Sequence, residues 1–326
     1  MKLLVIGGTV FLGRAVVEQA LARDCEVTIF HRGVHGSGIF GSEVESLIGD
    51  RTQDLSALKG RSWDAVIDTC GFEPEHVAAS GELLADAVEH YGFVSSGSAY
   101  RDWPDKPVDE DSEVFDSDKR EYGPLKAACE RALEAALPGR VLVARSGVIV
   151  GPNENIGRLP WWLRRIAAGG DVLAPGPGDA PMQLIDARDL AAWMLDMAES
   201  RRGGHFNAIA PRGSATWEEL LGACLEATGS DAELVWVDAG AVESNVEDPW
   251  DALPLWPIPS LAGLYGMSGE RGAAAGLVPR PLSETVADTW AWLRAGADLG
   301  DWRREVQVDG LSAERERELL DVLSEQ

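Results

Sequence analysis

The sequence has few cysteines, no long apolar run and few basic residues, and each of these excludes a class of protein or partner. Four cysteines occur in 326 residues, far apart and without a Cys-x-x-Cys pair, so we expect reduced structural thiols and no metal site. No apolar run reaches about 18 residues, so no transmembrane helix is predicted. Basic residues number 29 against 54 acidic ones, and the net charge of −25 repels phosphate backbones and anionic membranes. The composition therefore argues against nucleic-acid and membrane partners.

The start of the chain also lacks the marks of an exported protein. No basic region, apolar segment or cleavage site precedes the first apolar run, so we expect a cytoplasmic protein. A length of 326 residues accommodates one large domain or two, at roughly 100–200 residues per domain.

The most informative segment is a glycine-rich stretch near the N-terminus. Residues 2–6 are largely apolar, Gly-Gly-Thr-Val-Phe-Leu-Gly follows at 7–13, and residues 27–30 form a second largely apolar run. This order of strand, turn, helix and strand presents a helix N-terminus to a dinucleotide pyrophosphate. Gly7 allows a sharp turn off the strand, and Gly13 allows close packing of the helix. The segment therefore predicts a dinucleotide-binding site.

Apolar strands alternate with helical stretches through the first half of the chain. We expect strands at 2–6, 26–30, 64–68, 91–95 and 140–145, and helices at 13–23, 75–89 and 122–137. This pattern predicts an α/β fold, a Rossmann-type doubly wound parallel sheet. The dinucleotide-binding domain is expected at 1–150, with core elements returning at about 183–210, and a smaller C-terminal substrate-binding α/β region at 151–182 and 211–326.

Tyr122 and Lys126 form a second signal. They are four residues apart at the start of a predicted helix and therefore lie on one face of it. A nearby ammonium favours the phenolate and lowers the phenol pKa from its usual value of about 10. A phenol with a pKa nearer neutrality is a usable general acid/base. Upstream, serines 95, 96 and 98 stand at the end of a predicted strand, where parallel sheets bind their ligands.

Together these blocks resemble the short-chain dehydrogenase/reductase superfamily, in its extended and atypical branch with Gly-Gly-Thr-x-Phe-x-Gly. Further matching blocks are Gly49-Asp50, 145–152, 183–191 and Phe206-Asn207. The resemblance covers nearly the whole chain and is strongest over 1–210.

The resemblance implies a role for each matching residue. Tyr122 would be the acid/base, Lys126 would hold the nicotinamide ribose, and Ser96 would orient the substrate. The implied cofactor-binding residues are Gly7, Gly8, Thr9, Phe11, Leu12, Gly13, His31, Arg32, Asp50, Arg145, Gly147 and Val148.

Two departures from the family pattern bear on the cofactor. Val10 replaces the middle glycine of the usual fingerprint. His31-Arg32 stands where a ribose-binding Asp is expected after the second strand. Because an arginine pairs with a 2′-phosphate and an aspartate repels it, we expect NADP(H) to be favoured over NAD(H).

The substrate side is less clearly marked. Residues 151–182 are rich in Gly, Pro and Trp, and from them we expect Arg158, Trp161, Trp162 and Arg165 to contact a small-molecule substrate. Trp250, Trp256 and Tyr265 are further candidates. The alternative is that these aromatic residues fill the core of the smaller region.

Three functions remain open. The first is an NAD(P)-dependent oxidoreductase that transfers a hydride between nicotinamide and a carbonyl or hydroxyl carbon, with Tyr122 as acid/base. The second is a nucleotide-sugar epimerase with retained NAD, since arginines 158, 164 and 165 suit a diphosphate. The third is a non-catalytic RNA-binding or regulatory relative. The resemblance further implies a homodimer formed through helices 75–89 and 122–137. A sugar dehydratase is disfavoured because Gly97-Ser98 replaces its Asp-Glu pair.

Overall fold

The apolar runs form a parallel sheet in the computed structural model, which describes residues 1–117, 119–296 and 306–323. Within these residues seven strands pair in the order β11-β6-β5-β4-β1-β2-β3, and each pair is parallel. Their bounds are β1 (Lys2–Ile6), β2 (Glu26–His31), β3 (Glu45–Ile48), β4 (Ala65–Asp68), β5 (His90–Ser96), β6 (Val141–Ser146) and β11 (Gly204–Ala208). Strands β1, β4, β5 and β6 are buried along nearly their whole length, which explains their continuous apolar sequences.

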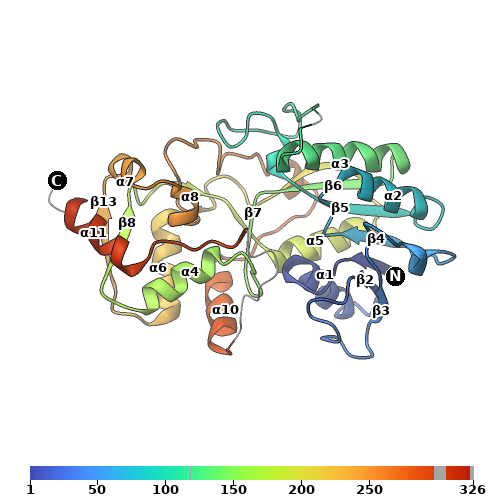
Figure 1. Ribbon diagram of the computed structural model, residues 1–326, viewed down its shortest axis with the longest axis horizontal. Helices are drawn as coiled ribbons and strands as arrows, with labels where there is room; N and C mark the ends of the chain where they lie inside the picture. Colours follow the sequence, from blue (N-terminus) through green and yellow to red (C-terminus); the bar gives the residue numbers. More distant parts are fainter. Residues whose placement is uncertain (118, 297–305, 324–326) are drawn as a thin grey trace.

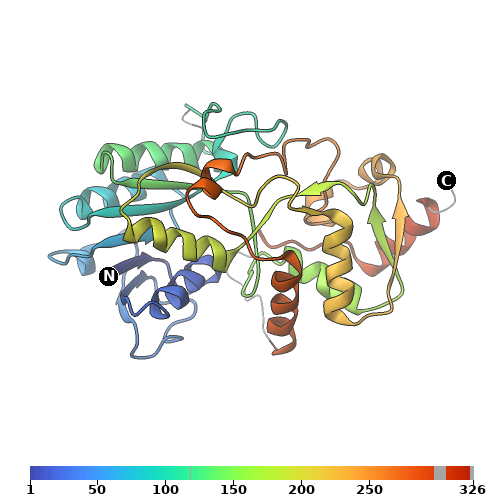
Figure 2. The same cartoon turned by 180° about the vertical axis from the view of Figure 1, so that it is seen from behind.

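Helices cover both faces of this sheet (Figures 1 and 2). On one face α1 (Phe11–Leu21) packs beside α5 (Ala187–Glu199), and on the other α2 (Pro74–Leu84) packs beside α3 (Tyr122–Ala136). Alternate residues of β1 serve the two cores, since Leu3 and Val5 join α1 and α5 in one cluster while Leu4 and Ile6 lie in the other. The predicted Rossmann-type doubly wound sheet is thereby confirmed.

A smaller α/β region lies at the other end of the elongated molecule (Figure 1). Its strand pairs are β8 with β13, which are parallel, and β9 with β12, which are antiparallel, while β7 pairs with β10 between the two regions. The strand bounds are β7 (Val148–Val150), β8 (Asp171–Pro175), β9 (Pro181–Met182), β10 (Leu184–Asp186), β12 (Ala215–Thr216) and β13 (Glu233–Val237). The helices are α4 (Arg158–Ala167), α6 (Trp217–Thr228), α7 (Ala239–Asn245), α8 (Pro249–Ala252), α9 (Glu270–Ala274), α10 (Leu282–Arg294) and α11 (Ala313–Leu323).

Three tryptophans lie in the core of this smaller region. Trp162 of α4 and Trp217 of α6 are fully buried, and their rings meet edge to face with centroids 5.0 Å apart. Trp256 is buried in the same cluster. The region therefore has its own core, separate from the two cores of the sheet.

Strand β3 and helix α4 are among the elements that the sequence did not predict. Strand β3 is a short edge strand whose residues are mostly exposed, so it lacks the apolar run of the inner strands. Helix α4 begins after Gly157 and carries Pro160 in its first turn, where proline is tolerated because the N–H it lacks would be unpaired there. In the sequence both residues indicate a loop, and the helix is recognisable only from its buried face.

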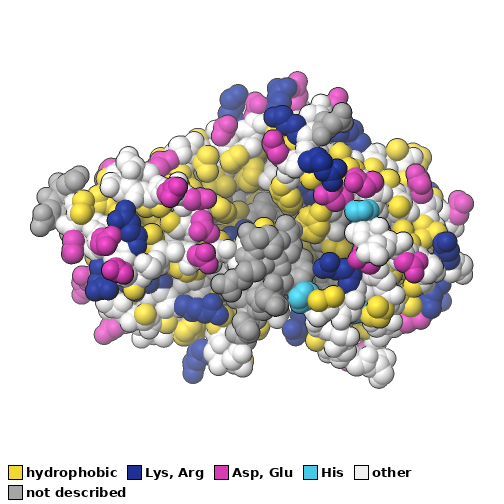
Figure 3. Space-filling model, in the orientation of Figure 1, with side chains coloured by type: hydrophobic (Ala, Val, Ile, Leu, Met, Phe, Trp, Pro, Cys, Tyr) yellow, Lys and Arg dark blue, Asp and Glu magenta, His cyan; other side chains and the backbone are white. Residues whose placement is uncertain are grey.

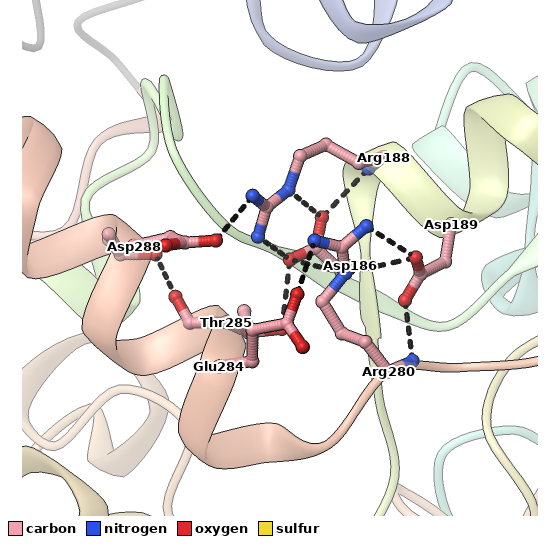
Figure 4. A network of polar contacts seen from close by, with 8 residues as sticks. Asp186, Arg188, Asp189, Arg280, Glu284, Thr285 and Asp288 are labelled. Atoms are coloured by element: carbon pink, nitrogen blue, oxygen red, sulfur yellow. Dashed lines mark hydrogen bonds and ion pairs between the residues drawn. The ribbon is translucent and has the colours of Figure 1, made fainter. Parts of the chain in front are cut away.

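A buried ionic network connects α10 to the start of α5 (Figure 4). The Asp186 carboxylate caps α5, accepts a hydrogen bond of 2.8 Å from the Thr285 hydroxyl, and pairs with Arg188 at 2.7 Å. Arg280 pairs with Asp189 at 2.7 Å in the same group. Because α10 also packs on α6 and α4, this network ties the smaller region to the sheet.

Candidate active site

A cleft of about 980 Å³ extends from the carboxyl ends of the sheet strands to the smaller region. Figure 3 shows the hollow between the two parts of the molecule, with hydrophobic side chains on its visible walls. The carboxyl edge of a parallel sheet is where open α/β folds bind their ligands. The cleft is therefore the candidate site, and its described lining comes from both regions.

The glycine-rich turn forms one wall of the cleft. Gly7 and Gly8 have φ angles of +107° and +94°, which favour glycine. A Cβ on Gly13 would lie 2.7 Å from the Gly8 nitrogen, so the first turn of α1 approaches the loop backbone closely only without a side chain. Thr9, Phe11 and Leu12 line the same wall. The glycines therefore allow the turn and α1 to pack closely on the sheet, which is the arrangement that presents a helix N-terminus to a pyrophosphate in dinucleotide-binding folds.

Val10 is accommodated without backbone strain. Its φ and ψ of −131° and 139° are extended, a conformation that does not require glycine. Its side chain lines the cleft just before α1 begins. The replaced glycine therefore alters the surface of the cleft and leaves the turn intact.

The end of β2 presents a neutral imidazole and an exposed guanidinium. The His31 ring lies 2.7 Å from the Ser46 hydroxyl and accepts a hydrogen bond from the Gly33 N–H, and burial lowers its pKa. Arg32 is exposed, lines the cleft, and helps to lower the pKa of Asp50. The principal cause of that lowered pKa is a hydrogen bond from the backbone N–H of Thr52, 2.9 Å from Asp50. Asp50 is therefore an ionised carboxylate on the cleft wall.

A buried ion pair behind this wall was not predicted. Arg51 donates to both carboxylate oxygens of Asp68 at 2.9 Å and to the Ser80 hydroxyl at 2.6 Å. The Tyr91 phenol donates to the same carboxylate, and burial raises its pKa well above the usual value. The signal was present, since an aspartate that ends a fully apolar strand must have a partner, but its partners lie far along the chain.

Tyr122, Lys126 and Ser96 all line the cleft. Tyr122 opens α3 and is 49% exposed, whereas Lys126 on the same helix face is 3% exposed. Ser96 ends β5, and its Oγ accepts a hydrogen bond from the Ser98 N–H at 3.1 Å. The neighbouring Ser95 hydroxyl donates to the buried Glu130 carboxylate. The Ser95 hydroxyl therefore belongs to a hydrogen bond in the core. The three predicted catalytic residues, Ser96, Tyr122 and Lys126, line the same cleft.

The ammonium of Lys126 is held by main-chain carbonyls. Its Nζ donates to Gly71 O and to Val94 O, both at 2.7 Å, and lies 4.2 Å from the centre of the Phe93 ring. Burial lowers the Lys126 pKa to about 8. The ammonium is therefore fixed between the ends of β4 and β5.

Arg145 near the end of β6 faces the core, and the segment after the strand faces the cleft. Gly147 and Val148 line the cleft, and a Cβ on Gly147 would lie 2.6 Å from Ile209. The Arg145 side chain is instead buried, pairs with Glu130 at 2.7 Å, and stacks 4.7 Å from the Tyr100 ring centre. Its guanidinium belongs to the core.

The prediction for the substrate side needs correction. Arg158 lines the cleft, but Trp162 is fully buried and donates to Pro254 O, and Trp161 packs edge to face on Trp162 at 4.7 Å. Arg165 pairs with Glu316 of α11. These three residues lie outside the lining because α4 turns its tryptophans into the core of the smaller region.

Later aromatic residues and an unpredicted loop complete this side of the cleft. Trp250 lines the cleft, whereas Trp256 and Tyr265 are buried. Trp103 and Pro104 also line it, although their acidic segment reads as a surface excursion in the sequence. Their contribution depends on contacts with residues more than a hundred positions away.

Comparisons with known proteins identify the family of this chain. The model of the NAD dependent epimerase/dehydratase family matches residues 3–208. The bovine epimerase family protein SDR39U1 is 30% identical over 256 residues, covering 71% of this chain and 82% of that protein. The chain belongs to the NAD-dependent epimerase/dehydratase family.

A second relative of this chain is named as a stem-loop binding protein. The chloroplast stem-loop binding protein of 41 kDa b from Arabidopsis thaliana is 28% identical over 245 residues, or 70% of this chain. The match spans 63% of the length of that protein.

Solved structures of similar fold extend over most of the chain. A UDP-N-acetylglucosamine 4-epimerase from Methanobrevibacter ruminantium, in complex with UDP-N-acetylmuramic acid, has a TM-score of 0.70 at 18% identity, covering 91% of this chain and 99% of that one. Human SDR39U1 with NADPH has a TM-score of 0.61 at 22% identity, covering 89% and 99%. At these identities the likeness shows the shared fold.

Two kinds of feature are absent from the described residues. None of their helices is long and apolar enough to cross a bilayer. Within the same ranges, no group of three or more His, Cys, Asp and Glu side chains could hold a metal ion.

Proposed function

We propose that this protein is an NADP(H)-dependent oxidoreductase that interconverts a carbonyl and an alcohol in a small-molecule substrate. The observation that carries the proposal is the meeting of Ser96, Tyr122 and Lys126 in the cleft that also contains the glycine cradle. When bound, the nicotinamide cofactor would supply or accept the hydride. Gly7, Gly8 and Gly13 would hold its pyrophosphate against the start of α1.

The side chains account for the movement of the proton. The Tyr122 phenol would donate its proton to the substrate oxygen during reduction, and its phenolate would accept a proton during oxidation. The Lys126 ammonium, fixed on the same helix face, favours the phenolate in both directions. A hydroxyl both donates and accepts, so Ser96 Oγ retains a proton to donate to the developing oxyanion.

The preference for NADP(H) rests on the end of β2. The exposed guanidinium of Arg32 lies on the cleft wall, and the strand ends without the carboxylate that would repel a 2′-phosphate. The similar human SDR39U1 was solved with NADPH, which is in keeping with this preference.

The test is a fluorescence titration of the full-length protein with NADPH and NADH. We expect NADPH to bind at least about tenfold more tightly, or roughly 1.4 kcal/mol. The Arg32→Ser protein should lose that preference, while Arg61→Ser should keep it, because Arg61 pairs with Glu45 outside the cleft lining. Tighter binding of NADH, or isolation of the protein with NAD already bound, would overturn the cofactor proposal and favour the epimerase with retained NAD.

A further inference from the structure

The half of the cleft that faces the smaller region is apolar. Its described walls include Trp103, Pro104, Ile156, Trp250, Leu261 and Leu264. When the hydrocarbon parts of a ligand displace water from such surfaces, the free energy of binding becomes more favourable. This half of the cleft therefore favours a ligand with substantial apolar area.

These walls are joined to one another. The Gly263 N–H donates to Pro104 O at 2.8 Å, and the Val108 N–H donates to Gly266 O at 3.2 Å. A Cβ on Gly263 would lie 2.1 Å from Lys106 O, so the two loops are packed backbone against backbone. The apolar half is therefore formed before a ligand arrives.

An internal carboxylate occupies the start of α4, where an anion would otherwise be favoured. Glu154 is fully buried and accepts hydrogen bonds from the N–H groups of Arg158 at 3.2 Å and Leu159 at 3.3 Å. Helix N-termini attract phosphate through free N–H groups and a positive dipole end. With Glu154 in place, these groups are no longer available to a substrate phosphate.

The arginine of this half is neutralised by the same carboxylate. Arg158 Nε lies 2.8 Å from Glu154 Oε1, and its Nη2 donates to Ile149 O at 2.7 Å. Arg165 is paired with Glu316 outside the lining. Among the described lining residues, this half of the cleft therefore offers a diphosphate no uncompensated arginine.

Two polar groups in these walls have no hydrogen-bond partner among the described residues. They are the side-chain amide nitrogen of Asn155 and the indole nitrogen of Trp103. Asn155 is 5% exposed. Both nitrogens are buried, and both belong to residues that line the cleft. Because buried N–H groups in proteins are nearly always paired, we expect a neutral acceptor oxygen of a ligand to pair with one of them.

We propose that the substrate is an uncharged, largely hydrocarbon ketone or aldehyde with a second acceptor oxygen, which Asn155 binds. This inference rests on the proposed oxidoreductase function. In the reduction, the carbonyl carbon gains a hydride from the reduced nicotinamide and its oxygen gains the Tyr122 proton. The carbonyl becomes an alcohol, and the cofactor leaves oxidised.

The first experiment compares matched substrates with the full-length protein and NADPH. The panel contains an aryl alkyl ketone with a methoxy group, its analogue without the oxygen, its carboxylate analogue, and UDP-glucose. We expect kcat/KM to be highest for the methoxy ketone and about 100-fold lower for the carboxylate. A higher kcat/KM for the carboxylate, or tighter calorimetric binding of UDP-glucose than of the methoxy ketone, would overturn the proposal.

Two substitutions assign the selectivity to these residues. Glu154→Gln keeps the side-chain size and leaves Arg158 charged, so kcat/KM for the carboxylate should rise at least about tenfold relative to the neutral ketone. Asn155→Leu should reduce kcat/KM more for the methoxy ketone than for the analogue without the oxygen, chiefly through KM. Equal losses for these two ketones would contradict the role of Asn155. Asn245→Leu, on the exposed side of α7, is the matched control.

Failure of this inference is distinguishable from failure of the proposed function. The titration with NADPH and the circular dichroism melting curve are measured for each variant. If NADPH binds and only charged substrates are reduced, the substrate class is wrong and the oxidoreductase stands. If NADPH does not bind to the folded protein, the proposed function itself fails.

Discussion

The two halves of the cleft are built by different means. The cofactor half consists of strand ends and short turns, and its charges are local: Arg32 and Asp50 stand on the wall, and Lys126 is held between two strands. The substrate half consists of long loops that meet across the fold, and its charges cancel between Glu154 and Arg158. The first arrangement suits a charged dinucleotide, and the second suits a neutral ligand.

The sheet region and the smaller region also differ in how their cores are packed. The sheet region buries alternate residues of its strands against paired helices, whereas the smaller region packs three buried tryptophans, at positions 162, 217 and 256, among aliphatic side chains of helices and loops. Removal of a fully buried tryptophan should therefore be costly in the smaller region, because the cavity it leaves lies inside a single core.

The largest expected effect is on chemistry in the shared centre. Tyr122→Phe removes the proposed proton donor and should lower kcat by about 10³-fold, within the usual range for general acid/base residues. The Kd for NADPH should change by less than about twofold, because binding draws on the cofactor half. Steady-state kinetics and titration measure both quantities. An unchanged kcat would show that Tyr122 is not the proton donor.

Two adjacent tryptophans, Trp161 and Trp162, test how much the smaller region depends on a fully buried side chain. Trp162→Ala removes a fully buried side chain and should lower the free energy of unfolding by about 3–5 kcal/mol. Trp161→Ala, at a half-buried position, should cost less than half of that. Urea denaturation of both proteins measures the difference. Similar losses would show that the smaller region does not depend on its buried tryptophan.

The charge of Lys126 predicts a pH dependence of the cofactor half. The ammonium carries its charge below a pKa of about 8 and is neutral above it, so support for the phenolate is lost as pH rises. We expect kcat/KM, which reports groups of the free enzyme, to fall by up to about tenfold above pH 8. Lys126→Arg keeps its charge over this range and should remove that limb of the profile. A limb that persists in Lys126→Arg would assign it to another group.

The smallest expected effect concerns the connection between the regions. Thr285→Val removes the hydrogen bond to the buried Asp186 carboxylate and should lower the free energy of unfolding by about 1–2 kcal/mol. Ser283→Ala, on the exposed side of the same helix, should have almost no effect. Denaturation curves of both variants measure the difference. A two-step transition in Thr285→Val alone would show that the ionic network around Asp186 couples unfolding of the smaller region to unfolding of the sheet. Equal stability of both variants would show that the network does not couple them.

Prediction from the sequence succeeded where the signal was local. The glycine turn, the placement of Tyr122 and Lys126 on one helix, and the strands of the sheet depend on residues close in the chain. Prediction was poorer for the substrate side, because tryptophans that face a core and tryptophans that face a cleft look alike in a loop-rich sequence. Trp162 belongs to the first class and Trp103 to the second.

The sequence by itself determined the fold class and pointed to the residues proposed here for proton transfer, since periodicity, glycine placement and i,i+4 spacing are short-range properties. Only the tertiary structure decided the charge balance of the cleft. It paired Arg51 with Asp68, neutralised Arg158 with Glu154, and left Asn155 without a partner among the described residues. Electrostatic free energy depends on distance and burial in space, and neither quantity can be read along the chain.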